Sequence, residues 1–326
     1  MIFIVVLFCL AACSTGSKQT TNITLAEVTR SVFYTPQYVA LEKGFFEEEG
    51  LNVDLQTTWG GDKTMTALLS DHADIALVGS ETSIYVYNQD ATDKVINFAQ
   101  LTQTDGTFLV AKEPMPNFTW SDVEGEKFLG QRKGGMPQMV GEFVLKQNGI
   151  DPHSDLEELI QNIDFANIPG AFASGDAKFV QLFEPTASVF EKEGNGYVVA
   201  SFGEESGLIP YTVFMAKESL FNDDQEVIEK FTRAIYKAQL WVAETDAEEI
   251  AKVVEPYFED AELDILASSI ERYKQQDSFA LDPILTEPAW DNLLQIMDEA
   301  GELPGDAPYE ELVNTDIAKK VIAELE

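Results

Sequence analysis

Short apolar runs alternate with segments of helical periodicity through most of the chain. This order of strand, turn and helix is typical of α/β layers rather than of a β-sandwich. Val53 and Leu55 alternate with polar residues and predict a half-buried strand, whereas the run 73–78 predicts a strand buried on both faces. The predicted strands are 23–28, the stretch around 53–55, 73–78, 95–98, 107–111, 127–129, 179–183, 197–201 and 209–216.

Helix-capping residues separate these strands in the first third of the chain. Pro36 lies in the first turn of a predicted helix over 36–41, and Gly44 is placed to end it. Asp62 can cap the N-terminus of a second helix over 63–69. These signals support the assignment of alternating strands and helices.

The strand and helix pattern restarts in the middle of the chain. A loop containing Pro114 and Pro116 precedes the strand 127–129, and this restart indicates a second lobe. After residue 216 the chain is almost purely helical, with apolar positions at helical spacing over 225–245 and 247–257. We therefore expect two α/β lobes followed by a helical C-terminal segment.

Composition limits the classes of partner. The 326 residues include 57 acidic and 21 basic side chains, for a net charge of -36. Such a chain repels phosphate backbones, so we expect no nucleic-acid partner. The acidic residues occur as doublets and triplets, which is typical of a solvated surface, and the triplet 47–49 is expected to face water.

Both cysteines lie in the first thirteen residues, MIFIVVLFCLAAC. An apolar run of about eleven residues is too short to span a bilayer but suits a signal peptide. The stretch Leu10-Ala11-Ala12-Cys13 resembles the bacterial lipobox, although no Lys or Arg precedes the run. The resemblance implies that residues 1–21 are a signal peptide and tether, that Cys13 carries a lipid, and that the protein is anchored at the outer face of the cell membrane.

Three glycine-containing turns end predicted strands and begin predicted helices. They are Gly60-Gly61-Asp62, Gly79-Ser80 and Gly134-Gly135. Open α/β sheets bind ligands at the carboxyl ends of their strands, so these turns are candidate ligand contacts, although a purely conformational role explains each one alone. The sequence has no G-x-G-x-x-G and no Walker A motif, and we expect no cofactor.

Three longer stretches carry a family resemblance: YVALEKGFFEEEGLNVDL, GGDKTMTALLSDHADIALVGSETSIYV and LFEPTASVFEKEGNGYVVASFGEESGLIPYTVF. They resemble the substrate-binding proteins of bacterial ABC importers in the nitrate, sulfonate, taurine and thiamine-pyrimidine-precursor superfamily. The resemblance implies a type II periplasmic-binding-protein-like fold, with two lobes joined by two crossover strands that close over a small ligand. Lobe one would comprise 22–108 plus 213–326, and lobe two 109–212. The implied partners are a small molecule, an ABC permease and its ATPase, with the binding protein acting as a monomer.

The resemblance and the strand ends together give candidate ligand contacts. Tyr34 could stack on a ring or cover the hinge, and capping explains Ser80 nearly as well as ligand binding does. Glu184 lies between two apolar residues, so its carboxylate needs a partner, either a ligand N–H group or a protein Arg. The predicted contacts are Tyr34, Thr35, Gln37, Gly61, Ser80, Glu81, Gln103, Arg132, Gly134 and Glu184.

The available aromatic, amide and carboxylate side chains favour a thiamine pyrimidine precursor or related heterocycle as ligand. A sulfonate, nitrate or taurine ligand and a role in ligand sensing remain alternatives. An enzyme resembling the pyrimidine synthases is a further alternative, but no cysteine follows Cys13, and His72 and His153 are the only histidines. We therefore expect neither catalytic nor metal-ligating residues.

Overall fold

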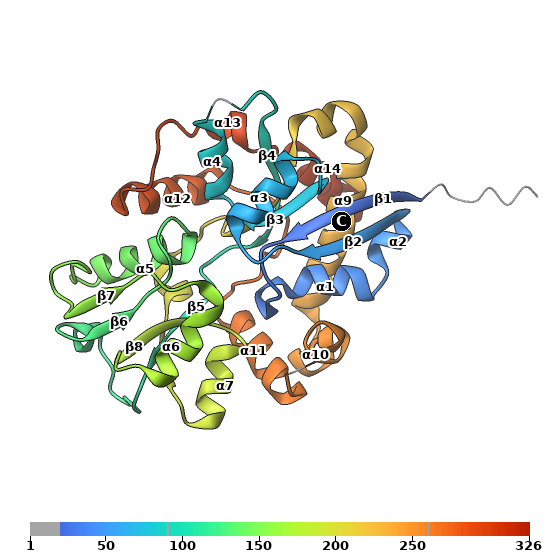
Figure 1. Cartoon of the computed structure of the whole chain (residues 1–326). Helices are drawn as coiled ribbons and strands as arrows, with labels where there is room; N and C mark the ends of the chain where they lie inside the picture. Colours follow the sequence, from blue (N-terminus) through green and yellow to red (C-terminus); the bar gives the residue numbers. More distant parts are fainter. Residues whose placement is uncertain (1–19, 90, 260) are drawn as a thin grey trace, which may run out of the picture.

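Two α/β lobes make up the described part of the chain, each built on its own sheet (Figure 1). The computed structural model describes residues 20–89, 91–259 and 261–326. Sheet A of lobe one has the order β2 (Leu51–Thr57), β1 (Thr21–Glu27), β3 (Ile75–Gly79), β10 (Thr212–Lys217) and β4 (Val95–Thr102). Sheet B of lobe two has the order β7 (Glu158–Ile160), β6 (Lys127–Leu129), β8 (Phe179–Phe183), β5 (Thr107–Ala111) and β9 (Tyr197–Ser201).

Each sheet is mixed, and in each the antiparallel strand follows a crossing between the lobes. In sheet A, β1 runs parallel to β2 and β3, whereas β10 lies antiparallel between β3 and β4. In sheet B, β6 runs parallel to β7 and β8, whereas β5 is antiparallel to β8 and β9. The predicted arrangement of two α/β lobes joined by two crossovers is confirmed.

The chain changes sheets at 103–106 and again at 202–211. Thr107 and Phe108 pair with Phe183 and Leu182 of β8, so β5 lies in sheet B from its first residue. The first crossover thus precedes the predicted boundary after residue 108, because that boundary falls inside β5. The second crossover ends at β10, one residue before the predicted start of the returning segment at 213.

Helices cover both faces of sheet A, and the helical C-terminal segment is confirmed (Figure 1). The longest helix, α9, begins before the predicted 225 because its first turns precede a break at Asp224, whose φ of -151° and ψ of 67° are not helical. The helices of this lobe are η1 (Val32–Tyr34), α1 (Thr35–Glu42), α2 (Phe45–Glu48), α3 (Gly61–Leu69), α4 (Glu81–Tyr87), α9 (Glu218–Glu244), α10 (Ala247–Val254), η4 (Glu255–Tyr257), α11 (Leu263–Gln275), α12 (Glu287–Glu299), α13 (Tyr309–Leu312) and α14 (Asp316–Leu325).

Lobe two carries shorter helices around sheet B. Its core is aromatic, and Phe128, Phe172, Phe179 and Phe202 are buried there. Burial of each such ring contributes about 1.5–3 kcal/mol. The helices are η2 (Trp120–Val123), α5 (Met136–Gln147), η3 (Phe165–Asn167), α6 (Ile168–Ser174), α7 (Thr186–Glu193) and α8 (Phe202–Ser206).

The acidic triplet 47–49 is less exposed than the sequence predicted. Phe46 is fully buried, with its ring 4.9 Å from that of Phe231 on α9. Glu49 accepts hydrogen bonds from Arg233 at 3.0 Å and from Lys237 at 2.7 Å. Burial opposes ionisation, but these cations outweigh it and lower the pKa of Glu49. The expectation that all three glutamates face water is therefore wrong for Glu49, which fastens α2 to α9.

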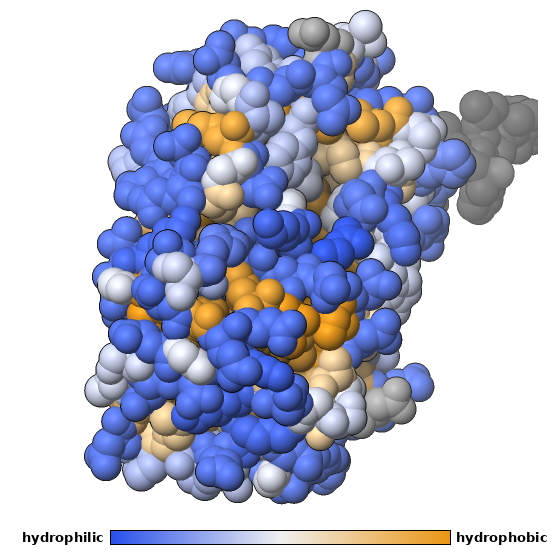
Figure 2. All heavy atoms as spheres, turned by 60° about the vertical axis from the view of Figure 1, so that its left-hand side comes forward, coloured by the Kyte–Doolittle hydropathy of each residue, from blue (hydrophilic) through white to orange (hydrophobic). Residues whose placement is uncertain are grey.

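Hydrophilic side chains cover most of the face that Figure 2 shows, and hydrophobic side chains gather in a band at mid-height, between the two lobes. Within the described residues, no helix is both long and apolar enough to cross a bilayer. Cys13 and the predicted signal peptide lie outside the described residues.

Candidate ligand-binding cleft

A cleft of about 570 Å³ lies between the two lobes. Lobe one contributes the segments that follow β1 and β2 and the junction of β3 with α4. Lobe two contributes the segments that follow β6 and β7, and the last residue of β8, Phe183. Tyr211, at the end of the second crossover, and Thr212, the first residue of β10, also line it. The cleft therefore lies at the carboxyl ends of strands from both sheets, and its volume suits a small metabolite.

Aromatic side chains form much of the cleft wall. Phe33 lies centrally, with its ring 5.5 Å from Tyr211 and 5.9 Å from Phe183. A Cβ on Gly106 would lie 2.8 Å from the Phe33 ring, so this close packing requires glycine in the first crossover. The aromatic residues lining the cleft are Phe33, Tyr34, Trp59, Tyr85, Phe165, Phe183 and Tyr211.

Glu81 provides a buried carboxylate in this aromatic cleft. It is the first residue of α4, is 5% exposed, and its Oε2 atom has no hydrogen-bond partner. A Cβ on Gly79 would collide with both carboxylate oxygens, which shows that the side chain folds back over the end of β3. Burial raises the pKa of Glu81 to about 7, against the opposing effect of the backbone N–H groups of Glu81 and Met136.

The basic residues of the cleft lie at its mouth. Lys63, Arg132 and Lys133 are all exposed. Arg132 lies 3.8 Å from Asp62 of lobe one and 3.8 Å from Asp164 of lobe two. Arg132 therefore bridges the two lobes across the opening of the cleft.

A chain of amide and carboxylate groups positions the 134–135 turn of lobe two. The Gly134 N–H donates to Gln138 Oε1 at 3.0 Å, and Gln138 Nε2 donates to Glu142 at 2.7 Å. Glu142 also accepts from Gln161 at 2.8 Å and contacts His153 at 3.1 Å. The cleft turn is thus held by buried side chains of α5.

The structure brings five of the predicted contacts together in the cleft lining and places the other five elsewhere. The cleft residues are Tyr34, Gly61, Glu81, Arg132 and Gly134.

Four of the remaining candidates satisfy protein groups near the cleft instead of lining it. The hydroxyl of Thr35 donates to the Val32 carbonyl, and Gln37 donates to buried Glu27 at 2.8 Å. The Ser80 hydroxyl donates to the Pro210 carbonyl at 2.5 Å and so ties α4 to the second crossover. Gln103 donates to the Asp277 carbonyl at 3.0 Å.

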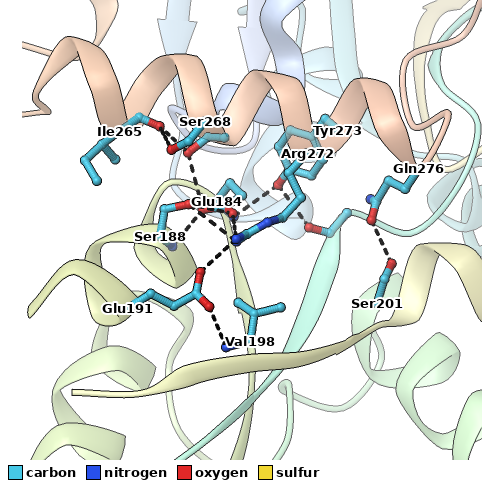
Figure 3. Close-up of polar contacts among 12 residues, drawn as sticks. Glu184, Ser188, Glu191, Val198, Ser201, Ile265, Ser268, Arg272, Tyr273 and Gln276 are labelled. Carbon is cyan, nitrogen blue, oxygen red and sulfur yellow. Dashed lines mark hydrogen bonds and ion pairs between the residues drawn. The ribbon is translucent and has the colours of Figure 1, made fainter. Parts of the chain in front are cut away.

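Glu184 differs most from its predicted role, because its carboxylate contacts protein groups and not the cleft. Its buried carboxylate accepts from Arg272 Nη1 at 2.5 Å and from the Ser188 backbone and hydroxyl at 2.9 Å each (Figure 3). Ser269 adds a hydrogen bond at 3.3 Å. The partner that this carboxylate needs is therefore a protein Arg, one of the options that the sequence left open, and Glu184 does not line the cleft.

Several cleft residues were not predicted as contacts from the sequence. Phe33 and Phe183 are apolar and cannot be told from core residues in the sequence. Phe165 follows β7, a three-residue strand without the apolar run that marks the others. Tyr211 lies within the predicted strand 209–216, but the strand begins at Thr212 and leaves Tyr211 in the crossover. Within the described residues, no group of three His, Cys, Asp or Glu side chains is placed to hold a metal ion.

The family model described as "NMT1/THI5 like" matches residues 32–249. The chain belongs to this family. A Bacillus subtilis (strain 168) protein named "Putative binding protein YtlA" is 60% identical over 321 residues, covering 98% of this chain and 96% of that protein.

Solved structures with this fold have low sequence identity to this chain. The ligand-binding component of an ABC-type import system from Staphylococcus aureus, with zinc bound, is 15% identical, with a TM-score of 0.73 over 93% of this chain and 99% of that one. The alkanesulfonate-binding protein SsuA from Xanthomonas axonopodis pv. citri, bound to MOPS, is 13% identical, with a TM-score of 0.71 over 91% and 99%. They confirm the expected periplasmic-binding-protein-like fold.

The same fold also carries enzymes. The desulfurization enzyme DSZB is 12% identical to this chain, with a TM-score of 0.66 over 94% of this chain and all of that one. Fold likeness alone therefore does not separate binding from catalysis, and function has to be argued from the cleft.

Proposed function

We propose that this protein is the extracytoplasmic solute-binding component of an ABC import system. The observation that carries the proposal is the aromatic cleft between two lobes that are joined by the crossovers 103–106 and 202–211. Names of relatives and fold neighbours support it, since these include a binding protein and a component of an ABC-type import system. No bond is made or broken in the proposed mechanism.

The proposed mechanism is capture by hinge closure. Solute enters while the lobes are apart, contacts both lobes, and stabilises the closed arrangement because only that arrangement makes both sets of contacts. The closed form is then presented to a membrane permease, and a separate ATPase supplies the energy. We further propose that a lipid on Cys13 holds the protein, as a monomer, at the outer face of the cell membrane.

The ligand that we propose is a thiamine pyrimidine precursor or a related heterocycle. Rings from lobe one, lobe two and the second crossover line the same cleft, so a flat ring can be covered from several sides at once. The exposed basic residues at the mouth and the fold shared with SsuA favour the alternative of a sulfonate. The two ligand classes are separated by the experiment below.

The proposal is tested by a thermal-shift screen followed by titration. The screen contains aminopyrimidines, other heterocycles, nitrate, taurine and alkanesulfonates, because a compound that binds only the folded protein raises Tm. Trp59→Ala should then lower the affinity for the compound that binds most tightly by about tenfold, because Trp59 lines the cleft. Its side chain is 61% exposed and contributes little to folding. Leu281→Ala, equally exposed and outside the cleft lining, is the matched control. Equal affinity in the two variants would place the binding site elsewhere.

A further inference from the structure

Glu81 is the polar cleft residue whose environment constrains the charge of the ligand most strongly. Resting on the proposed solute-binding function, we propose that Glu81 accepts a hydrogen bond from an N–H group on a planar, neutral or cationic heterocycle and excludes anions. The inference depends on the position of the carboxylate, on its unused hydrogen-bonding capacity and on the charges around it.

The carboxylate lies where the two lobes approach each other. Glu81 begins α4 in lobe one, and its side chain folds back over Gly79 at the end of β3. On the other side, the backbone N–H of Met136, at the start of α5 in lobe two, favours its ionised form. A ligand held between the lobes would therefore lie against this carboxylate.

One carboxylate oxygen is left without a protein partner. Oε2 is buried and accepts no hydrogen bond, although the charge of Glu81 acts on Tyr34, Tyr85 and Tyr211 nearby. The Tyr85 hydroxyl is directed to the Gly134 carbonyl at 3.5 Å instead. A buried acceptor without a donor is costly, and a ligand N–H group supplies the missing bond.

The charges in the cleft work against an anionic ligand. A bound anion would meet the Glu81 carboxylate next to the α5 N-terminus, the position at which the N–H groups of a helix would otherwise attract it. The basic side chains that line the cleft are exposed at its mouth, and Arg132 already lies near Asp62 and Asp164. No basic side chain that lines the described cleft is buried beside Glu81 to offset its charge.

An aminopyrimidine edge matches this environment. Its exocyclic N–H donates to Oε2, and its flat ring suits the aromatic walls formed by residues such as Phe33 and Tyr34. A protonated amino-heterocycle gains a charge-assisted bond in addition. A simple alkanesulfonate such as methanesulfonate, or nitrate, has only acceptor oxygens and cannot supply the missing donor.

The test compares ligand classes on the full chain and on Glu81→Gln. The probes are 4-amino-5-hydroxymethyl-2-methylpyrimidine, a wider set of amino-heterocycles, methanesulfonate and nitrate, each titrated by calorimetry at pH 8, where Glu81, whose pKa burial raises to about 7, is mostly ionised. We expect the wild type to bind an amino-heterocycle and none of the anions. Glu81→Gln should lower the affinity for that heterocycle at least tenfold, because the amide oxygen carries no charge. Glu113→Gln, an exposed glutamate outside the cleft lining, should bind like the wild type.

The outcomes separate this inference from the proposed function. Binding of an anion by the wild type, or an unchanged heterocycle affinity in Glu81→Gln, would overturn the role of Glu81 while leaving solute capture in place. A wild type that binds no compound of the screen would overturn solute capture, and the ligand class with it. Gain of anion binding by Glu81→Gln would support the exclusion role directly.

Discussion

The two lobes touch in two very different ways on the two sides of the molecule. Near the crossovers, Arg272 of α11 pairs with buried Glu184 at 2.5 Å and with Glu191 at 2.7 Å. At the cleft mouth, Arg132 and Asp62 approach only to 3.8 Å, and both side chains are more than half exposed. Water and salt weaken the second contact far more than the first.

Helix α11 and the residue that follows it, Gln276, contact the first crossover and lobe two (Figure 3). The Tyr273 hydroxyl donates to the Gly106 carbonyl at 2.9 Å and accepts from the Glu184 N–H at 3.1 Å. Ser201 donates to Gln276 at 2.7 Å. In the proposed hinge closure, this contrast predicts that the lobes separate at the mouth and stay together along α11.

The largest effect is expected from Arg272→Met. Removing the guanidinium leaves Glu184 buried without its cation, which should lower the free energy of unfolding by about 3 kcal/mol or more. Urea denaturation measures the change. Adding Glu184→Gln to the variant should recover part of the loss, because a neutral amide is less costly to bury.

Lys230→Met is the matched control for that variant. Its side chain is 29% exposed, against 28% for Arg272, but its partner Glu226 is mostly exposed. We expect little change in stability. Equal losses in the two variants would mean that the α11 contact is no stronger than a surface pair.

Glu81→Gln should have an intermediate effect that depends on pH. The folded pKa of about 7 lies above the ordinary value of 4.5, so the folded state binds more protons between these values. The stability from this group is fully present below pH 4.5 and is lost as the pH rises through 7. Glu81→Gln should therefore be more stable than the wild type at pH 8, by up to about 3 kcal/mol, and this gain should disappear at pH 4.5.

Thermal denaturation of both proteins from pH 4.5 to 8 measures the difference. Burial also raises the pKa of Asp105, to about 6, and adds a slope of the same sign in both proteins. The difference between the two curves isolates Glu81. Parallel curves would show that the Glu81 carboxylate is well solvated in the free protein.

Asp62→Asn should have the smallest effect on stability, less than about 1 kcal/mol, because the Arg132 contact is exposed. Its effect should appear instead as a broader distribution of distances between the lobes, measured by spin labels placed on each lobe. Asp54→Asn, an exposed change on β2, is the control. A distance distribution that Asp62→Asn leaves unchanged would show that the Arg132–Asp62 contact does not hold the lobes together at the cleft mouth.

Much of the fold could be predicted from local pattern alone. Strands such as β3 and β8 are apolar runs that are buried along almost their whole length. The strand β7 escaped prediction because none of its three residues is fully buried. Local pattern also placed Gly61, Glu81 and Gly134 correctly at strand ends that meet in the cleft.

The role of Glu184 could not be predicted from its surroundings in the sequence. Its cation, Arg272, lies 88 residues further along the chain and on the other lobe. The apolar neighbours of Glu184 correctly predicted burial and the need for a partner. Whether that partner is a ligand or a protein side chain depends on how the two lobes pack together. The residues next to Glu184 in the sequence contain no information about this packing.

The position of β10 has a consequence for the order in which the chain can acquire structure. Sheet B uses strands from 107 to 201 only, so every strand of lobe two is present once that stretch has been made. Sheet A is complete only after Thr212–Lys217 has been synthesised, because this strand lies between β3 and β4. Until then those two strands present unpaired edges, the feature that promotes aggregation of partly made chains. The middle of the sequence, 107–201, thus completes its sheet first, and the lobe that contains the N-terminal strands completes its sheet last.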